Sequence, residues 1–351
     1  MASNPPRIGI LGATGAVGST ILQVLAERGF EAAEVVPLAS ERSAGSKVAY
    51  GSDELEVRLL EEPALEGLDL VLSSAGGSVS EEWAPKAVAA GAVVVDNTSF
   101  WRMNDKVPLV ISEVNPEALD SHMGIVANPN CSTMQMVVAL APLHRKVGVE
   151  RIVVSTYQSV SGTGRRALEE MRDQSRAMLA GNEPSPSEIY PHRIAFNVIP
   201  QVESFKGGDD YTTEERKMMD ETRKILGAGD EIGISATCAR VPVEIGHAES
   251  INLTTSGDLS PERCRELLAE APGVVVADEP SNAVYPLPSE VAGVDDVYVG
   301  RIRRDPSAEN TLNLWVVGDN LRKGAATNAV QLAETLIERD LVRVPSPSIV
   351  D

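Results

Sequence analysis

Short apolar runs alternate with amphipathic stretches over about the first 130 residues of the chain. The run RIGILGA begins at residue 7, and after a Gly-rich turn apolar residues recur at helical spacing at Val17, Ile21, Val24 and Leu25. Gly29 is placed to end that helix. Further apolar runs are EVVPLAS, LDLVLSSAG, VVVDN, LVISEV and GIVANPN. Strands that alternate with helices in this way predict a parallel α/β sheet.

Beyond about residue 150 the pattern changes to longer strand-like segments: RIVVSTYQSVSG, RIAFNVIPQV, GISATCARVPV, HAESINLTTSG, VYVGRIRRD and TLNLWVVGD. They predict one larger antiparallel or mixed sheet. Thr212 caps a predicted helix over 213–226, with Glu215 completing a capping box. Ser260 caps a second helix over 261–271, and a last helix is predicted over about 323–340.

These patterns predict two domains. The first comprises residues 1–131 plus 322–351, because we expect the last helix to pack back on the N-terminal sheet, and the second comprises 132–321. The final residues, PSPSIVD, are expected to be disordered. The fold class is therefore α/β for the first domain, with an α+β second domain that carries a large mixed sheet.

Charge and composition narrow the classes of function. The net charge is −20, which disfavours contact with nucleic acid or with an anionic membrane. No apolar run approaches the roughly 20 residues that span a bilayer, and the N-terminus lacks a signal-peptide pattern, so we expect a cytoplasmic protein. The three cysteines are too scattered for a disulfide framework or a zinc site, so no metal is expected.

The Gly-rich turn after the first strand has the pattern of a dinucleotide-binding site. Gly12, Gly15 and Gly18 follow a strand and open a helix, where glycines allow a tight turn and close approach of a pyrophosphate to the helix N-terminus. The spacing is GxxGxxG and not GxGxxG, so an ordinary turn remains an alternative. After the second strand, Arg42 lies between Ser40 and Ser43. An arginine among hydroxyls suits a 2′-phosphate, which favours NADP over NAD and predicts a Rossmann-like NADP-binding domain. The neighbouring Glu41 is a feature of NAD sites, and a solvated loop charge remains the alternative for Arg42.

A second strand-to-helix turn, Asn128-Pro129-Asn130-Cys131, carries a candidate nucleophile. The helix that follows places Cys131 in its first turn, where the helix dipole favours the thiolate, which is the attacking species. Cys238 lies inside a predicted strand and Cys264 in an apolar helix, so both are expected to be ordinary buried thiols.

A thiolate nucleophile needs a base and charged groups that hold the substrate. His247 leaves the end of a predicted strand together with Arg240 and Glu244, and the other three histidines have no nearby chemistry. Taken alone, the pattern of His247 is more typical of a surface or structural imidazole than of a catalytic one. Lys217, on a helix with acidic residues at i−3 and i+4, has the pattern of a solvated salt-bridge residue.

Nine motifs together resemble the aspartate-semialdehyde dehydrogenase family from about residue 7 to residue 340. They are GATGAVG, SERSAG, NTSFWR, NPNCST, YQSVSGTG, FNVIPQV, TEERK, CARVPVEIGH and GDNLRKGAATNAVQ. The resemblance implies NADPH-dependent reductive dephosphorylation of L-aspartyl-4-phosphate to L-aspartate 4-semialdehyde through a cysteine thioester. That step lies on the route to lysine, methionine and threonine, and diaminopimelate lies on the lysine branch of that route.

The resemblance also implies roles for residues that match its motifs. Cys131 would be the nucleophile, His247 the acid/base, and Gln158 the glutamine that orients substrate beside the thiol. Arg240 would clamp the substrate α-carboxylate and Glu214 would meet its α-ammonium. The phosphate-binding positions would be Arg102, Asn130 and Lys217. Lys217 would then be a ligand-binding residue and not an ordinary solvated salt-bridge residue. The NADP-contact positions would be Gly12, Thr14, Gly15, Ala16, Val17, Gly18, Ser40, Arg42, Ser43, Ser161, Gly162 and Asn320.

Two alternatives remain at this stage. N-acetyl-γ-glutamyl-phosphate reductase shares the chemistry, but it tends to show NPGCYPT where this chain has Asn130 before the cysteine and Ser132 after it. A non-catalytic relative of the same fold would be expected to lack the nucleophile or the base. Members of the resembling family form homodimers, sometimes tetramers, and nothing in the sequence decides between these two states.

Overall fold

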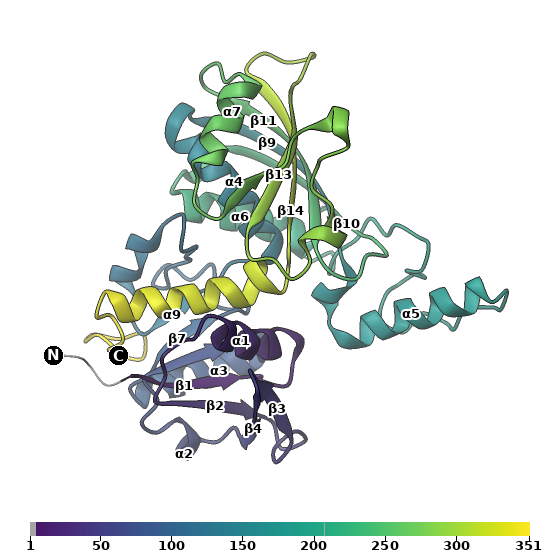
Figure 1. The fold of residues 1–351 in the computed structure, drawn as a ribbon. Coiled ribbons are helices and arrows are strands. Elements are labelled where there is room, and N and C mark those ends of the chain that lie inside the picture. Colours follow the sequence, from purple (N-terminus) through teal and green to yellow (C-terminus); the bar gives the residue numbers. More distant parts are fainter. Residues whose placement is uncertain (1–4, 207) are drawn as a thin grey trace. The chain divides into compact units, whose positions relative to one another are not determined.

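The structure is a computed structural model that describes residues 5–206 and 208–351. The chain divides into two compact units (Figure 1), one formed by residues 1–130 and 325–351 and the other by residues 131–324. Within the described residues, no helix is both long and apolar enough to cross a membrane.

The first unit is built on a six-stranded sheet in the order β5-β2-β1-β6-β7-β8. Every neighbouring pair is parallel. The residues of β6 and β7 are buried throughout, as expected of apolar strands covered on both faces. The strands are β1 (Arg7–Leu11), β2 (Glu34–Ala39), β5 (Arg58–Leu59), β6 (Leu70–Ser73), β7 (Val93–Asp96) and β8 (Ile125–Ala127), with a separate hairpin of β3 (Lys47–Tyr50) and β4 (Asp53–Glu56).

Helices α1 and α9 share one core with this sheet, although more than 300 residues separate them in the sequence (Figure 1). Ile21 and Leu25 of α1 and Leu332 and Leu336 of α9 are completely buried in that core. The return of the C-terminal helix to the first sheet therefore stabilises the unit through apolar burial. The helices are α1 (Ala16–Glu27), α2 (Glu62–Leu65), α3 (Gly77–Ala89), the 3₁₀ turn η1 (Pro116–Ser121) and α9 (Asn328–Glu338), which the π-helical segment η5 (Arg322–Thr327) precedes.

Two sequence predictions for this unit are wrong. The run LVISEV is not a strand and contributes only an isolated bridge from Leu109 to Ala127. Its backbone turns because the Asn115 side chain donates to the Leu109 carbonyl and accepts from Ile111 N, both at 2.9 Å. The C-terminal tail is ordered by packing, since Ile349 N donates to the Met123 carbonyl at 2.7 Å and Ser348 is buried.

The second unit is built on a mixed six-stranded sheet in the order β10-β9-β11-β14-β13-β12. The outer pairs β10-β9 and β12-β13 are parallel and the inner pairs are antiparallel. The α/β fold class with a second, mixed-sheet domain is thereby confirmed. The strands are β9 (Val149–Gln158), β10 (Gly233–Arg240), β11 (His247–Thr255), β12 (Val274–Val276), β13 (Val297–Arg304) and β14 (Thr311–Gly318).

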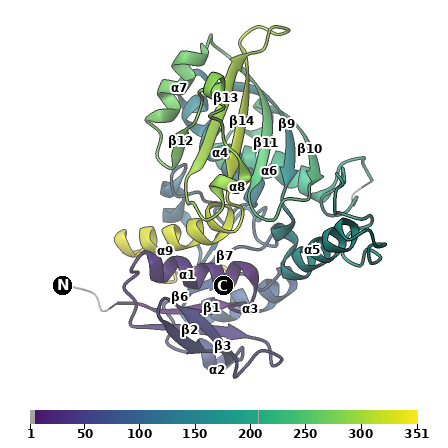
Figure 2. The same ribbon diagram turned by 45° about the vertical axis from the view of Figure 1, so that its right-hand side comes forward.

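Helices α4 (Cys131–Val147), α6 (Thr213–Leu226) and α7 (Pro261–Ala269) pack on one face of this sheet (Figure 2), which we call the covered face. Helix α6 begins and ends as predicted, with the Thr212–Glu215 capping box at its start and Gly227 in a left-handed conformation at its end. Helix α7 ends two residues before its predicted end. The remaining elements are η2 (Val160–Thr163), α5 (Arg165–Leu179), η3 (Gly229–Glu231), η4 (Pro280–Asn282) and α8 (Pro288–Val291).

The predicted strand RIAFNVIPQV is also wrong. Asn197 closes a turn there, since its side chain donates to the Arg193 carbonyl at 2.8 Å and its backbone N–H donates to the Ile194 carbonyl at 3.1 Å. Phe196 takes a left-handed φ of 53° within that turn. Only Ile199 pairs with the sheet, through a bridge to Arg240.

Candidate active site

Three of the candidate residues lie in one row across the covered face of the second sheet. Parallel register pairs Arg240 of β10 with Gln158 of β9, and antiparallel register pairs His247 of β11 with Gly318 of β14. Because Ala248 pairs with Tyr157, the same register brings His247 opposite Gln158. Strand topology therefore brings Gln158 beside Arg240 and His247, which both lie more than 80 residues further along the chain.

The His247 ring is completely buried, and its surroundings decide which nitrogen carries the proton. The backbone N–H of Ser159 donates to Nδ1 at 3.0 Å, so in the neutral ring the proton lies on Nε2. Nε2 has no hydrogen-bond partner among the described residues. Burial lowers the pKa of His247 well below its usual value, and the positive charge of Arg240 lowers it further. The neutral imidazole is therefore the resting form.

A small polar network holds the loop on which His247 begins. The Asn320 Oδ1 accepts from Gly246 N at 2.9 Å and from Ser159 Oγ at 3.0 Å, while its Nδ2 donates to Ser161 Oγ at 2.9 Å. Ser159 Oγ also lies 3.1 Å from His247 Nδ1. The structure thus brings together Ser161 and Asn320, which the sequence assigned to the cofactor, in the support of His247. Sequence reasoning missed Ser159, whose only signal is its place after Gln158.

Gly162 lies beside both ends of this row, the Arg240 guanidinium and the His247 imidazole. A Cβ built on it would lie 3.3 Å from Arg240 Nη1 and 3.4 Å from His247 Nε2. A larger residue would therefore crowd the space that both side chains face.

Cys131 is the first residue of α4 and is partly exposed, whereas Cys238 and Cys264 are completely buried. Burial raises the pKa of both buried thiols, that of Cys264 to about 12, so neither is a nucleophile at neutral pH. Gly324 packs against the reactive position, because a Cβ there would lie 2.8 Å from the Cys131 Cβ. Sequence reasoning missed Gly324, although a glycine within the RKGAATN stretch is a signal of close packing.

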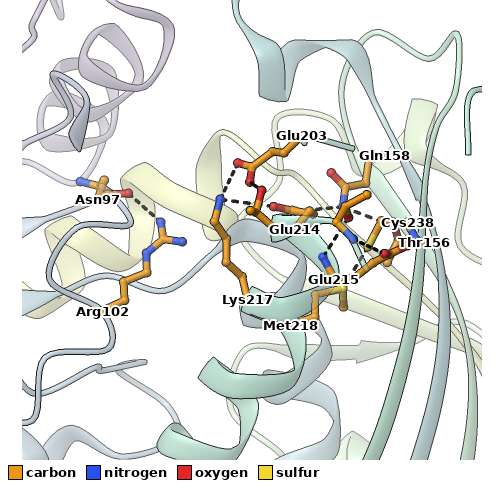
Figure 3. Close-up of polar contacts among 12 residues, drawn as sticks. Asn97, Arg102, Thr156, Gln158, Glu203, Glu214, Glu215, Lys217, Met218 and Cys238 are labelled. Carbon is orange, nitrogen blue, oxygen red and sulfur yellow. Dashed lines mark hydrogen bonds and ion pairs between the residues drawn. The ribbon is translucent and has the colours of Figure 1, made fainter. Parts of the chain in front are cut away.

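Glu214 and Lys217 lie on α6, and Figure 3 shows Glu214 next to Gln158 of this row. Gln158 Nε2 donates to Glu214 Oε1 at 3.0 Å, which ties the orienting glutamine to a carboxylate that is almost fully buried. Lys217 Nζ lies 3.6 Å from Glu214 Oε2 and forms a closer ion pair with Glu203. Sequence reasoning missed Glu203, which precedes the helix by ten residues. The Lys217 ammonium is thus available for an anion only in competition with carboxylates.

Arg240 is buried and its Nη1 donates to the Ser159 carbonyl at 2.6 Å. Its Nε has no partner among the described residues. An orphaned guanidinium N–H in a buried site is costly unless a ligand accepts it. The carboxylate of a ligand is a suitable acceptor.

In the first unit, the Gly-rich turn is shaped by close backbone contacts. Gly12 has φ +81°, and a Cβ on Gly18 would lie 2.1 Å from the Gly12 carbonyl oxygen. Gly15, the N-cap of α1, provides no side-chain cap, and the first turn of α1 holds no acidic residue. The backbone between Gly12 and Gly18, including Thr14, Ala16 and Val17, therefore suits a bound pyrophosphate.

Ser40, Arg42 and Ser43 form a turn directly after β2, closed by a bond from Ser43 N to the Ser40 carbonyl at 2.8 Å. Arg42 is exposed and forms no ion pair with any described residue. Its charge is therefore available for a phosphate.

Arg102 is buried in the first unit and fixed by backbone carbonyls. Its Nε donates to Asn128 O at 2.9 Å and its Nη2 to Asn97 O at 2.7 Å (Figure 3). Asn128 lies on the turn before Cys131, and Asn130 on that turn is buried. The guanidinium is held in one orientation before any ligand binds, which favours binding of an anion.

Comparison with known proteins identifies the class first. Residues 7–122 match the family model "Semialdehyde dehydrogenase, NAD binding domain", and residues 140–323 match "Semialdehyde dehydrogenase, dimerisation domain". The two models cover the two units that the fold defines, so the chain is a semialdehyde dehydrogenase in class.

The more specific family follows from individual relatives. The chain is 52% identical to aspartate-semialdehyde dehydrogenase of Aquifex aeolicus over 339 residues, which cover 96% of this chain and 99% of the relative. Aspartate semialdehyde dehydrogenase II of Vibrio cholerae, solved in complex with ASA, is 44% identical with a TM-score of 0.92, covering 96% and 99% of the two chains. The enzyme of Candida albicans, solved with NADP, is 25% identical with a TM-score of 0.73, covering 96% and 99%. The chain belongs to the aspartate-semialdehyde dehydrogenase family, as its motifs predicted.

Proposed function

We propose that the chain converts L-aspartyl-4-phosphate to L-aspartate 4-semialdehyde, releasing phosphate and consuming NADPH. The observation that supports this reaction most directly is the row of Arg240, Gln158 and His247 on the covered face, with Glu214 beside it. Arg240 offers a cation, Gln158 an amide and His247 an imidazole N–H. Glu214, beside the row, adds a carboxylate. Those are the groups that an amino acid with a reacting side-chain carbonyl requires.

NADP fits the residues of the first unit. The turn between Gly12 and Gly18 leaves no space for a Cβ at Gly18 and leaves the N-terminus of α1 without a side-chain cap. Arg42, with Ser40 and Ser43, would hold the 2′-phosphate. From the second unit, Ser161, Gly162 and Asn320 would contact the cofactor in addition to their bonds with the His247 loop. When bound, NADPH supplies the hydride.

The substrate would be held by opposite charges. Arg240, whose Nε has no partner in the described part of the chain, binds the α-carboxylate, and the buried Glu214 binds the α-ammonium. Gln158 is held by its bond to Glu214 and orients the reacting carbonyl. The candidates for binding the phosphoryl group or free phosphate are Arg102 and Asn130 in the first unit and Lys217 in the second.

Cys131 carries the covalent step. Its thiolate, favoured by the first turn of α4, attacks the acyl carbon, and the bond from that carbon to the phosphate oxygen breaks. Phosphate leaves with the electron pair, and a thioester remains on Cys131. After reduction to the thiohemiacetal, the C–S bond breaks to give the aldehyde and the thiolate.

His247 is the acid/base for the substrate oxygen. In the resting tautomer Nε2–H donates a hydrogen bond to that oxygen as negative charge develops on it. When the ring takes up a second proton, Ser159 Oγ can accept from Nδ1–H, so the same serine serves both charge states. Acid/base help of this kind contributes about 10²- to 10⁴-fold in rate.

A homodimer is supported by the face of the second sheet opposite α4 and α6, which we call the open face. Tyr157 and Trp315 project from it with ring centroids 5.5 Å apart, and Tyr157 is 39% exposed. Aromatic residues on an open sheet face are typical of subunit interfaces. The family match to a dimerisation domain covers the same residues.

We also propose a cytoplasmic location, which suits diffusible substrates.

The decisive assay follows phosphate-dependent NADPH formation from L-aspartate 4-semialdehyde and NADP. We expect wild-type turnover that requires phosphate, turnover below detection for Cys131→Ala, and unchanged turnover for the matched control Cys264→Ala at a buried thiol. A parallel reaction with NAD tests the cofactor. Wild-type protein that fails here but reduces N-acetyl-γ-glutamyl phosphate would show that the substrate is wrong.

A further inference from the structure

Behind the row of substrate-binding residues lies a second row that contains an unexplained acid. Thr156 pairs with Cys238 on one side and with Glu249 on the other, and Glu249 pairs in turn with Val316. Glu249 lies two residues after His247 on β11, so the two side chains share the covered face. Its side chain is completely buried.

No described residue satisfies Glu249. Both carboxyl oxygens lack a hydrogen-bond partner and no ion pair reaches them. The titratable groups that face this part of the sheet are Glu214 and Glu215 of α6, Cys238 of β10 and His247 of the same strand, and none of them is a cation. Burial raises the pKa of Glu249 well above its usual value, and the charge of Glu214 raises it further. A lone buried carboxylate in such surroundings is strongly unfavourable.

Gln135 is the side chain beside Glu249 that can form hydrogen bonds with it. It lies on α4 one turn after Cys131, and its Nε2 donates to the His247 carbonyl at 3.2 Å. Gln135 Oε1 is buried and has no partner in residues 5–206 and 208–351, and the amide approaches Glu249 closely enough to influence its ionisation. A Cβ on Gly318 would lie 2.9 Å from that Oε1, so Gly318 makes room for the amide.

We propose that Glu249 is a positioning residue that, as the neutral acid, pairs with the Gln135 amide and fixes the helix of Cys131 against the strand of His247. In this pair the Glu249 O–H donates to Gln135 Oε1, and the second N–H of Gln135 donates to the Glu249 carbonyl oxygen. All the orphaned oxygens of the two side chains are then satisfied, while the first N–H of Gln135 keeps its bond to His247. No step of the reaction uses the Glu249 proton. The role in positioning rests on the proposed function, because it concerns the geometry of Cys131 and His247.

Three variants test the pair. Glu249→Gln keeps the shape and both hydrogen bonds, so kcat and its pH profile should stay within about 2-fold of wild type. Glu249→Leu and Gln135→Leu each remove the pair, and each should lower kcat about 10-fold with KM for semialdehyde and phosphate unchanged. The double variant Gln135→Leu/Glu249→Leu should lose no more than either single variant.

An infrared measurement tests the protonation state without using activity. At about pH 8, wild-type protein should show the C=O stretch of a protonated, buried carboxylic acid, and Glu249→Gln should lack that band. Absence of the band in wild type would overturn the proposal even if Glu249→Leu does not fold. Loss of activity in Glu249→Gln as large as in Glu249→Leu, or a new limb in its pH profile, would overturn it too. Wild-type protein without turnover would refute the proposed function and the positioning role together, whereas the band decides the state of Glu249 alone.

Discussion

The Gly-rich turn of the first unit and the row of Arg240, Gln158 and His247 in the second unit are built in opposite ways. The turn uses the backbone of seven consecutive residues from Gly12 to Gly18, and its shape follows from glycines at positions where a Cβ does not fit. The row uses side chains from three strands whose register places Arg240, Gln158 and His247 side by side. In the Gly-rich turn, a Cβ added at Gly12 or Gly18 would collide with neighbouring backbone atoms. In the row, each side chain depends on neighbouring residues that hold it in position.

The largest effect should come from His247. His247→Asn removes the Nε2–H and the ring that Ser159 holds, so we expect kcat to fall about 10²- to 10⁴-fold with KM changed only a few-fold. The matched control, His192→Asn, changes an exposed loop histidine and should leave kcat unchanged. Steady-state kinetics in both directions measure this. If kcat of His247→Asn stayed within about 5-fold of wild type, the change in activation free energy would be only on the order of 1 kcal/mol. His247 would then not be the acid/base of the reaction.

Gly18→Ala probes the backbone-built site. The added Cβ would lie 2.1 Å from the Gly12 carbonyl oxygen, so either the turn opens or α1 shifts. We expect NADP affinity to fall at least about 10-fold and thermal stability to fall as well. Gly257→Ala, where a Cβ meets nothing within 4 Å, is the matched control and should change neither. Titration of the protein fluorescence with NADP measures this affinity. If Gly18→Ala bound NADP with wild-type affinity, this turn would not be the NADP site.

Arg42→Ala should have a smaller and more selective effect. Arg42 has no ion pair to lose within the part of the chain that is described, so the variant should fold normally. We expect KM for NADP to rise about 10-fold while kcat/KM with NAD changes little, because only NADP carries the 2′-phosphate. Lys47→Ala, which removes an exposed lysine of the same unit, should leave both values unchanged. Equal losses with both cofactors would refute the role of Arg42.

The smallest and most gradual effects should be those of pH on stability, and the two buried titratable groups of β11 act with opposite sign. The pKa of His247 is lowered by folding, so below about pH 6.5 the unfolded chain binds a proton that the folded one does not, and stability falls as pH falls. The pKa of Glu249 is raised by folding, so above about pH 4.3 the folded chain keeps a proton that the unfolded one releases, and stability falls as pH rises.

Each group contributes at most about 1.4 kcal/mol per pH unit within its window. Glu249→Gln should therefore gain stability relative to wild type as pH rises from about 5 to 8, and His247→Asn should gain as pH falls below about 6.5. Urea unfolding across this range measures both. Curves of wild type and Glu249→Gln that run parallel would show that Glu249 is ionised in the folded protein.

Features encoded locally could be predicted from the sequence. The capping box of α6 lies where Thr212 and Glu215 predicted it, and α4 begins at Cys131 as the strand-to-helix turn indicated. Two apolar runs were taken for strands because periodicity does not reveal that Asn115 and Asn197 close turns with their side chains. The tail after residue 345 was expected to be disordered because its docking depends on a tertiary contact.

The candidate site shows the same division. Cys131 and the Gly-rich turn carry their own local signals. Ser159, Glu203 and Glu249 carry none, because their importance comes from the residues that strand register and helix packing bring next to them. Lys217 has the spacing of a surface salt bridge, and only the family resemblance marked it as a phosphate-binding candidate.

The central claim is that Cys131 carries the acyl group in a site completed by the row of β9, β10 and β11. The most direct test mixes the protein with L-aspartate 4-semialdehyde and NADP in the absence of phosphate, and then measures intact mass and digested peptides. Without phosphate the thioester cannot be released as acyl phosphate, so we predict one aspartyl adduct per chain, on the peptide that contains Cys131, with one equivalent of NADPH formed. No adduct, or an adduct on the peptide of Cys238 or Cys264, would contradict this account.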